Sequence, residues 1–270
     1  MATKIVVDAG HGGSNPGAVY QGRRESDDAL RLAMAVGRIL EENGYDVSYT
    51  RTTDTTQSVG QKAAIANEEG ADLFVSIHRN AAEYPGKYSG VQTLIYDDSG
   101  IKKEMAQNIN ANLERLGFRN AGVSIRPNLV VLNSTQMPAL LVEAGFIDST
   151  TDNQLFDSRF QAIAQGIADG IMETLENQKS EVEAQADSVN SQLVSLLVSY
   201  KALQQDIENQ QVRIGEVGQD LAVAQENEQK QYEDMKLRIT YMYENGDASF
   251  AEAILTATSY SDLVNKSEYV

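Results

Sequence analysis

An apolar heptad repeat in the last third of the chain constrains the fold more than any other sequence feature. Between Val182 and Ala224, apolar residues recur at alternating spacings of four and three, at twelve of thirteen positions. This period is typical of a helix that packs against another helix in a coiled coil. A continuous helix over residues 178–243 would be about 100 Å long, at about 1.5 Å per residue. We therefore predict a long helix whose apolar seam needs a second helix, from another copy, a different protein or a returning arm of the same chain.

The end of this segment predicts a change of structure. Asn245-Gly246-Asp247 breaks the repeat, and a short amphipathic helix over about 250–257 and a capped segment from Ser259 are expected to follow. Nothing between Ser259 and Val270 is long enough to form a returning arm.

The first part of the chain differs in composition from this helical segment. Residues 1–176 contain 17 of the 20 glycines and all four prolines, whereas residues 177–270 are rich in Gln, Glu and Asn. We therefore expect an N-terminal domain over 1–176 and a helical coiled-coil segment over 177–270.

The N-terminal domain alternates short runs rich in Val, Ile and Leu with helical patterns. The predicted strands are 4–8, 46–50, 73–77, 91–96, 129–132 and 140–142, and the predicted helices are about 27–42, 58–69, 101–116 and 153–176. This alternation indicates an α/β fold, with a mainly parallel twisted sheet covered by helices on both faces.

Composition excludes several classes of function. The chain has 22 basic and 39 acidic residues, a net charge of −17, which argues against a nucleic-acid partner because a basic face would be needed to meet phosphates. It has no Cys, which excludes Cys-ligated zinc and thiol catalysis. No apolar run approaches the roughly 20 residues of a membrane span, and no signal peptide is visible at the start.

The two histidines of the chain each close a predicted strand. His11 lies in Asp8-Ala9-Gly10-His11-Gly12-Gly13 after the first strand, and His78 lies in Ser76-Ile77-His78-Arg79-Asn80 after the third. Functional sites assemble where parallel strands end, and a catalytic zinc ion typically takes three protein ligands. Two histidines and one carboxylate would suit zinc, although both could be ordinary loop histidines.

Two acidic positions are candidates for the same site. Glu25, before the first predicted helix, is the candidate third ligand, with Asp27 and Asp28 as competitors; all three could instead stabilise the start of the helix. Glu143 follows an apolar strand, so its carboxylate must be paired, hydrogen-bonded or close to a metal. Beside a zinc ion it could accept a proton from water and pass it to a leaving amine, although a structural Glu is the alternative.

These motifs occur in the order found in zinc-dependent N-acetylmuramoyl-L-alanine amidases of the amidase-3 family, which the whole N-terminal domain resembles. The matching stretches are residues 8–13, 16–18, 25, 50–51 with 54, 65–67, 76–81, 137–139 and 141–146. The sequence departs from the family pattern at Ser26, Lys62, Asp148 and Ser149, and none of these is a candidate ligand.

The resemblance implies a site and a reaction. His11, Glu25 and His78 would bind Zn2+, Glu143 would be the catalytic acid and base, and we place Arg79 and Asn80 on the substrate side. The reaction would be hydrolysis of the amide between N-acetylmuramic acid and L-alanine of peptidoglycan, so action in the cell wall or outside the cell is expected. Residues 97–128 are long enough for one helix and a loop, so we expect no helical plug over the site, such as some relatives carry.

The tail resembles the coiled-coil module of bacterial division-linked hydrolases and amidase activators. The resemblance lies in residues 235–238, 243–247, 253–257 and 260–266, and the chain contains only the ascending helix and tip of that module. It implies docking on a membrane complex of the cell-division ABC-transporter type and restraint of an attached autolysin. The alternative is a coiled coil that only self-associates.

Three functions therefore remain open at the level of sequence. The first is a peptidoglycan amidase that its coiled coil regulates or targets. The second is a non-catalytic peptidoglycan-binding or scaffolding protein, and the third is a phage-type lysis amidase.

Overall fold

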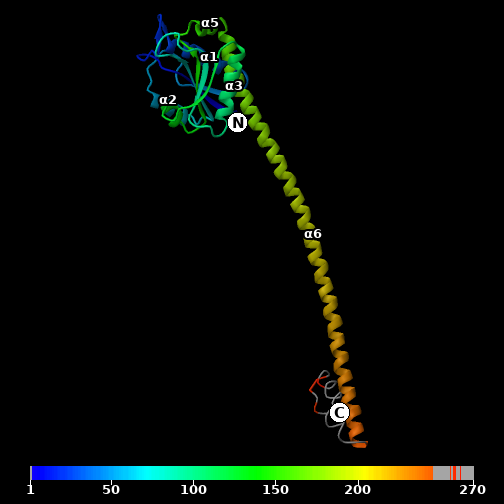
Figure 1. Cartoon of the computed structure of the whole chain (residues 1–270). Helices are drawn as coiled ribbons and strands as arrows, with labels where there is room; N and C mark the ends of the chain where they lie inside the picture. Colours follow the sequence, from blue (N-terminus) through cyan, green and yellow to red (C-terminus); the bar gives the residue numbers. More distant parts are fainter. Residues whose placement is uncertain (1, 246–255, 257, 260–261, 263–270) are drawn as a thin grey trace. The chain divides into compact units, whose positions relative to one another are not determined.

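The computed structural model describes residues 2–245, 256, 258–259 and 262, and the chain divides into two compact units (Figure 1). The first unit, Met1–Ala186, is an α/β domain, and within the second, Asp187–Val270, residues 187–245 are helical. None of the helices in the described part of the chain is long and apolar enough to cross a membrane.

A six-stranded sheet forms the centre of the first unit, in the order β4-β1-β5-β8-β6-β7. All neighbouring strands are parallel except β6 and β8, which are antiparallel. The strands are β1 (Lys4–Ala9), β4 (Asp46–Tyr49), β5 (Leu73–Asn80), β6 (Val91–Ile95), β7 (Asn120–Ile125) and β8 (Ala139–Phe146), and a separate hairpin pairs β2 (Val19–Tyr20) with β3 (Arg23–Arg24). The predicted mainly parallel α/β fold is confirmed.

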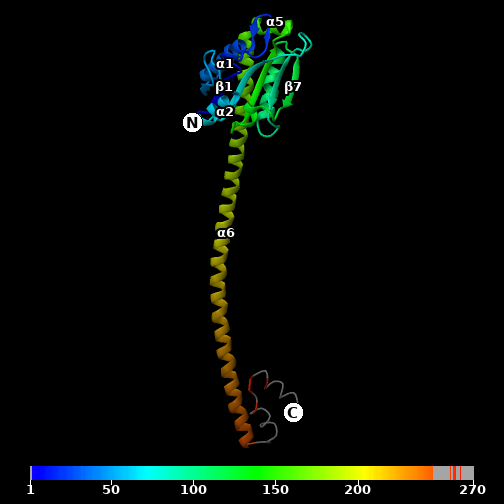
Figure 2. The same ribbon diagram turned by 90° about the vertical axis from the view of Figure 1, so that its left-hand side faces the viewer.

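Helices cover both faces of this sheet (Figure 2). Alternate residues of each strand point to opposite faces, so Val7 packs in one buried cluster and Val6 in another. The first cluster includes residues of α1 (Glu25–Glu42), α3 (Lys102–Arg115), α5 (Thr150–Ser158) and the start of α6 (Phe160–Asn245). The second includes residues of α2 (Val59–Glu68) and α4 (Val130–Asn133).

The structure differs from the predicted elements in three places. Of residues 129–132, predicted as a strand, the last three lie in helix α4 and Leu129 is its N-cap, because a four-residue apolar run is compatible with either state. Residues 97–128 contain strand β7 as well as helix α3; β7 is a half-exposed edge strand without a strong apolar pattern. The predicted helix over 153–176 is two helices, since α5 ends at Ser158 and α6 begins at Phe160.

The predicted long helix over 178–243 lies within α6, which runs without a break from Phe160 to Asn245. Its seam side chains are exposed, as Leu196 (67%) and Ile214 (71%) illustrate. Apart from Thr256, the predicted helix over 250–257 lies outside the described residues. In the segment predicted to start at Ser259, the Asp262 N–H donates to Ser259 Oγ at 3.1 Å.

A buried ion pair lies at the carboxyl end of β1. The Asp8 carboxylate is fully buried and accepts hydrogen bonds from Lys62 Nζ (2.6 Å), Thr50 Oγ1 (2.5 Å) and Ser76 Oγ (2.5 Å). Burial acts to raise the pKa of Asp8, but the Lys62 ammonium and the two hydroxyls hold that pKa below its ordinary 3.8. The ionised Asp8 carboxylate therefore stabilises the folded state at pH values above 3.8. This stabilisation is lost as the pH falls below 3.8 and passes through the lower pKa of the folded state.

We predict that Lys62→Met destabilises the domain by about 3–5 kcal/mol, because it leaves the Asp8 charge buried without a cation. Urea unfolding at pH 7 measures this loss. The exposed Lys103→Met is the control, and the double variant Asp8→Asn with Lys62→Met should be more stable than Lys62→Met alone. Equal stability of Lys62→Met and the control would contradict the prediction.

Candidate metal centre

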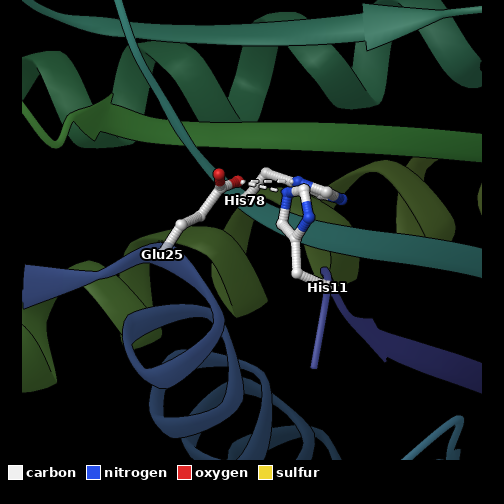
Figure 3. A group of neighbouring side chains, drawn as sticks. All are labelled: His11, Glu25 and His78. Atoms are coloured by element: carbon white, nitrogen blue, oxygen red, sulfur yellow. Dashed lines mark hydrogen bonds and ion pairs between the residues drawn. The ribbon is translucent and has the colours of Figure 1, made fainter. Parts of the chain in front are cut away.

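His11, Glu25 and His78 come together from three different parts of the chain (Figure 3). His11 follows β1, His78 lies in the neighbouring strand β5, and Glu25 is the first residue of α1. Glu25 Oε1 lies 3.0 Å from His11 Nε2 and 2.8 Å from His78 Nδ1, and the donor atoms of all three lie within 4.8 Å of one another. Two imidazoles and one carboxylate form a donor set that suits zinc.

Neighbouring groups hold these side chains in orientation. The amide oxygen of Asn15 lies 3.2 Å from His11 Nδ1, which favours a proton on that atom and leaves Nε2 free for a metal. The backbone N–H of Ala18 donates to Glu25 Oε2 (2.9 Å), and that of Arg79 donates to Glu25 Oε1 (3.2 Å). The donor set is therefore partly arranged in advance by the fold.

Glu25 is ionised in this arrangement. Burial opposes its charge, but the two histidine rings hold the pKa of Glu25 well below its ordinary 4.5. The competing acids are placed elsewhere: Asp28 pairs with Arg23 and Arg79, and Asp27 is exposed beside Arg24. Of the acids at the start of α1, Glu25 alone joins the two histidines.

Two glycines make room for the cluster. A Cβ at Gly10 would lie 2.5 Å from ring atoms of His78, and a Cβ at Gly17 would lie 2.5 Å from Glu25 Oε2. Between them, His11 itself has a positive φ of 59°, a conformation that non-glycine residues rarely adopt. The glycine-rich loop thus serves to bring the backbone close to the donor atoms.

Glu143 lies beside this cluster. It is paired in register with His78 across β5 and β8, and adjacent strands are about 4.8 Å apart. Its Oε2 is buried and has no hydrogen-bond partner among the described residues. Burial raises the pKa of Glu143 to about 7, although His78 acts in the opposite direction.

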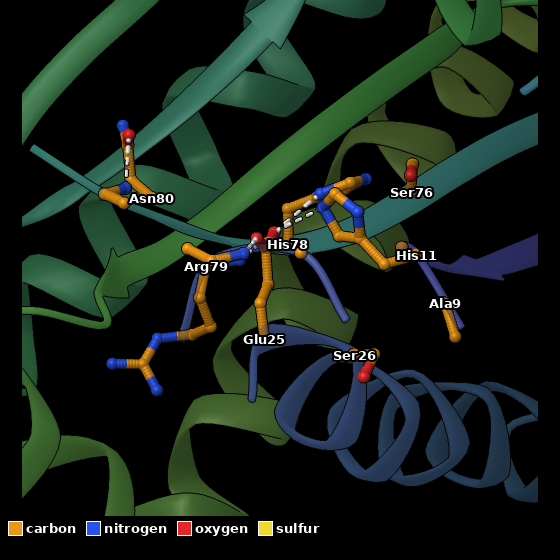
Figure 4. Close-up of polar contacts among 12 residues, drawn as sticks. Ala9, His11, Glu25, Ser26, Ser76, His78, Arg79 and Asn80 are labelled. Carbon is orange, nitrogen blue, oxygen red and sulfur yellow. Dashed lines mark hydrogen bonds and ion pairs between the residues drawn. The ribbon is translucent and has the colours of Figure 1, made fainter. Parts of the chain in front are cut away.

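The Arg79 side chain is buried and points away from the two histidines (Figure 4), and its assignment to the substrate side stays a prediction. Its guanidinium pairs with Asp28 of α1 at 2.7 Å and lies 4.1 Å from the ring centre of Phe156. It also donates to the carbonyl oxygens of Gly145 and Phe146. Arg79 therefore fastens α1 to the end of β8.

Asn80 is partly buried, and its side-chain oxygen accepts a hydrogen bond from the N–H of Ala81 (2.8 Å). Its assignment to the substrate side stays a prediction.

Arg51 is a further residue of the site, to which the sequence analysis assigned no role. Its Nη2 donates both to the Gly10 carbonyl and to the Ser26 carbonyl, each at 2.8 Å. Gly10 precedes His11 and Ser26 follows Glu25, so one guanidinium joins the backbones that carry two of the three donors. In the sequence, the feature that could have indicated this role is the position of Arg51 just after β4, at the carboxyl edge of the sheet.

We predict that Arg51→Lys weakens zinc binding by about 10- to 100-fold, because a single ammonium cannot bridge both carbonyls in the same geometry. Competition with a fluorescent chelator measures the zinc affinity, and the exposed Arg38→Lys is the control. Zinc affinity equal to that of the control would show that this bridge does not position the donors.

Comparison with known proteins agrees with this arrangement. Residues 5–173 match the family model described as N-acetylmuramoyl-L-alanine amidase. The chain is 35% identical over 207 residues to the sporulation-specific N-acetylmuramoyl-L-alanine amidase of Bacillus subtilis, covering 70% of this chain and 79% of the relative. It is 34% identical over 189 residues to the endolysin of Bacillus phage SPP1, covering 66% and 68% of the two chains.

A solved structure shows the same fold. The N-acetylmuramoyl-L-alanine amidase of Clostridium difficile 630 superposes with a TM-score of 0.61 at 30% identity, covering 65% of this chain and 97% of that one.

Proposed function

The chain belongs to the N-acetylmuramoyl-L-alanine amidase family, and we propose that it uses zinc to hydrolyse the amide bond between N-acetylmuramic acid and L-alanine in peptidoglycan. The observation that carries this proposal is the convergence of His11, Glu25 and His78 beside the buried carboxyl of Glu143. Its substrate would be the cell wall, so the protein would act at the wall or outside the cell.

The three donors fit a zinc ion of the catalytic kind. His11 Nε2, His78 Nδ1 and Glu25 Oε1 would hold the metal, and three protein ligands are the number that a catalytic zinc ion typically takes. When bound, zinc supplies a Lewis acid that polarises a carbonyl and lowers the pKa of water.

Glu143 would transfer a proton from the attacking water to the leaving amine. With a pKa of about 7 it can exist in either form at neutral pH, which suits a group that first accepts and then donates a proton. Its carboxylate would take a proton from the water that attacks the amide carbon. As the carbon–nitrogen bond breaks, the same carboxyl would deliver that proton to the amine of the departing L-alanine.

We predict that Glu143→Gln lowers the hydrolysis rate at least about 100-fold, because the amide cannot accept the proton, while zinc is still bound. The measurement is the mass of peptides released from purified peptidoglycan, with zinc content assayed alongside. Glu68→Gln on α2 is the control. Stem peptides beginning with L-alanine, released by the wild type and by Glu68→Gln but not by Glu143→Gln, would support the amidase function. A wild type that binds zinc and releases no peptide, even when the helical segment is removed, would favour a binding module.

The helical segment over 177–270 would regulate or target this activity. The proposal is supported by the exposed apolar seam of α6, which would be stabilised by pairing. Such a partner could be a second copy of the chain or a division-type ABC-transporter-like membrane complex. Ile171 and Thr174 are buried, and the first unit extends to Ala186, so a truncation should spare the first part of α6.

We predict that a chain ending at Ala186 hydrolyses peptidoglycan faster than the full chain, because the proposed restraint is removed. Release of stem peptides at equal protein and zinc concentrations measures the difference. The rates of the two proteins on a small soluble muramyl peptide serve as the control for intact chemistry. Equal rates on peptidoglycan would exclude inhibition by the segment.

A phage-type lysis enzyme is the second candidate, and the similarity to the SPP1 endolysin favours it. Both candidates would cleave the same amide bond. They differ in whether the helical segment restrains this activity.

A further inference from the structure

We propose that Tyr84, Lys87 and Tyr88 form a subsite for the glycan strand of peptidoglycan, next to the metal centre. This inference rests on the proposed function, since it names the part of the substrate that this surface would hold. The three residues lie in the loop of residues 81–90, which connects β5 to β6 and starts directly after Asn80.

The loop lies at the edge of the sheet where the donors converge. Tyr88 packs against Phe146 with ring centres 6.1 Å apart, and Phe146 pairs with Asn80 in the sheet. Asn80 is two residues beyond His78, or about 7 Å along the strand. These steps limit the distance from the His78 backbone to the Tyr88 ring to roughly 20 Å, a span that one extended polymer can bridge.

The loop is held in one conformation by hydrogen bonds at both ends and a turn between them. Asp148 accepts from the N–H of Ala82 (3.2 Å), and Asp152 accepts from the N–H of Gly90 (2.7 Å). In Tyr84-Pro85-Gly86-Lys87, the Lys87 N–H donates to the Tyr84 carbonyl at 3.1 Å. Proline in second place and a glycine with φ of 77° in third place are typical of a type II turn.

Lys87 joins the two rings. Its Nζ lies 5.6 Å from the ring centre of Tyr84 and 5.1 Å from that of Tyr88, distances at which a cation is attracted to aromatic rings. Both rings are nevertheless exposed, Tyr84 to 62% and Tyr88 to 49%. The result is a pair of aromatic surfaces with a cation near both rings, open to solvent.

This surface matches the chemistry of a polysaccharide. The C–H faces of pyranose rings pack on exposed aromatic rings, and hydroxyl and acetamide oxygens accept hydrogen bonds from an ammonium or a phenol. Tyrosine also loses little conformational entropy on binding, because only two torsions are fixed. A bare stem peptide offers carboxylates to Lys87 but no ring to pack on the two tyrosines.

The absence of Trp from the sequence allows a direct binding test. In Tyr88→Trp the introduced indole is the only one in the chain, so its fluorescence reports this loop alone. We expect peptide-free glycan strands to shift the emission, and free stem peptide to leave it unchanged. The control is Tyr96→Trp, at an exposed tyrosine following β6. The proposal would be overturned if glycan strands left the indole emission of Tyr88→Trp unchanged, or if free stem peptide shifted this emission and glycan strands did not.

A second variant tests the contribution to binding and turnover. Tyr84→Ala with Tyr88→Ala should bind glycan strands roughly tenfold more weakly and keep the zinc affinity of the wild type. Tyr88→Phe keeps the ring against Phe146 and should bind within about twofold of the wild type. Hydrolysis of polymeric peptidoglycan should fall with the loss of binding, and it should fall more than hydrolysis of a single muramyl peptide, which has no neighbouring sugars to lose from the subsite.

The two proposals fail in different ways. If the wild type cleaves peptidoglycan and the double alanine variant binds and cleaves it equally well, the subsite is wrong and the amidase function stands. If the wild type cleaves neither substrate, the amidase function is wrong, and the fluorescence titration of Tyr88→Trp still decides whether the loop binds glycan.

Discussion

The hydrogen-bonded pairing of the buried Asp8 carboxylate is the interaction on which the arrangement of the candidate metal centre depends. It is held by Lys62 of α2, by Thr50 after β4 and by Ser76 of β5, so one charge joins three elements to β1. Asp8 lies three residues before His11, and Ser76 lies two residues before His78. A buried charge tolerates little displacement of its partners, which fixes the two strands that carry the histidines in register.

Two buried arginines extend this constraint to the third donor. Arg51 joins the His11 loop to the first turn of α1, and Arg79 joins the same helix to the end of β8 through Asp28 and two carbonyls. Glu25 begins this helix, where its carboxylate is also favoured by the helix dipole. The donors thus come from a loop after β1, from strand β5 and from the start of α1, while groups outside the donor set hold these segments in position.

The two units of the chain meet different physical requirements. The first buries its own apolar residues on both faces of its sheet, and its buried polar side chains are hydrogen-bonded with few exceptions, one of which is Glu143 Oε2. An unsatisfied buried oxygen costs stability in a folded domain, so its presence at the metal centre is consistent with a role in chemistry. The described helix of the second unit leaves its apolar seam exposed, which is the reason that we propose a role in association for it.

The sequence by itself determined the α/β class, the long helix and the residues that meet at the centre. These depend on local periodicity, on histidines placed at strand ends and on motifs of a known family, all of which are readable along the chain. Only the tertiary structure decided the state of residues 129–132, the strand β7 and the burial of Arg79. A four-residue run has no period long enough to separate helix from strand, and β7 is defined by pairing with β6. The groups through which Arg51 and Arg79 join other elements lie 25–74 residues away along the chain, so the roles of both arginines depend on contacts that no local pattern encodes.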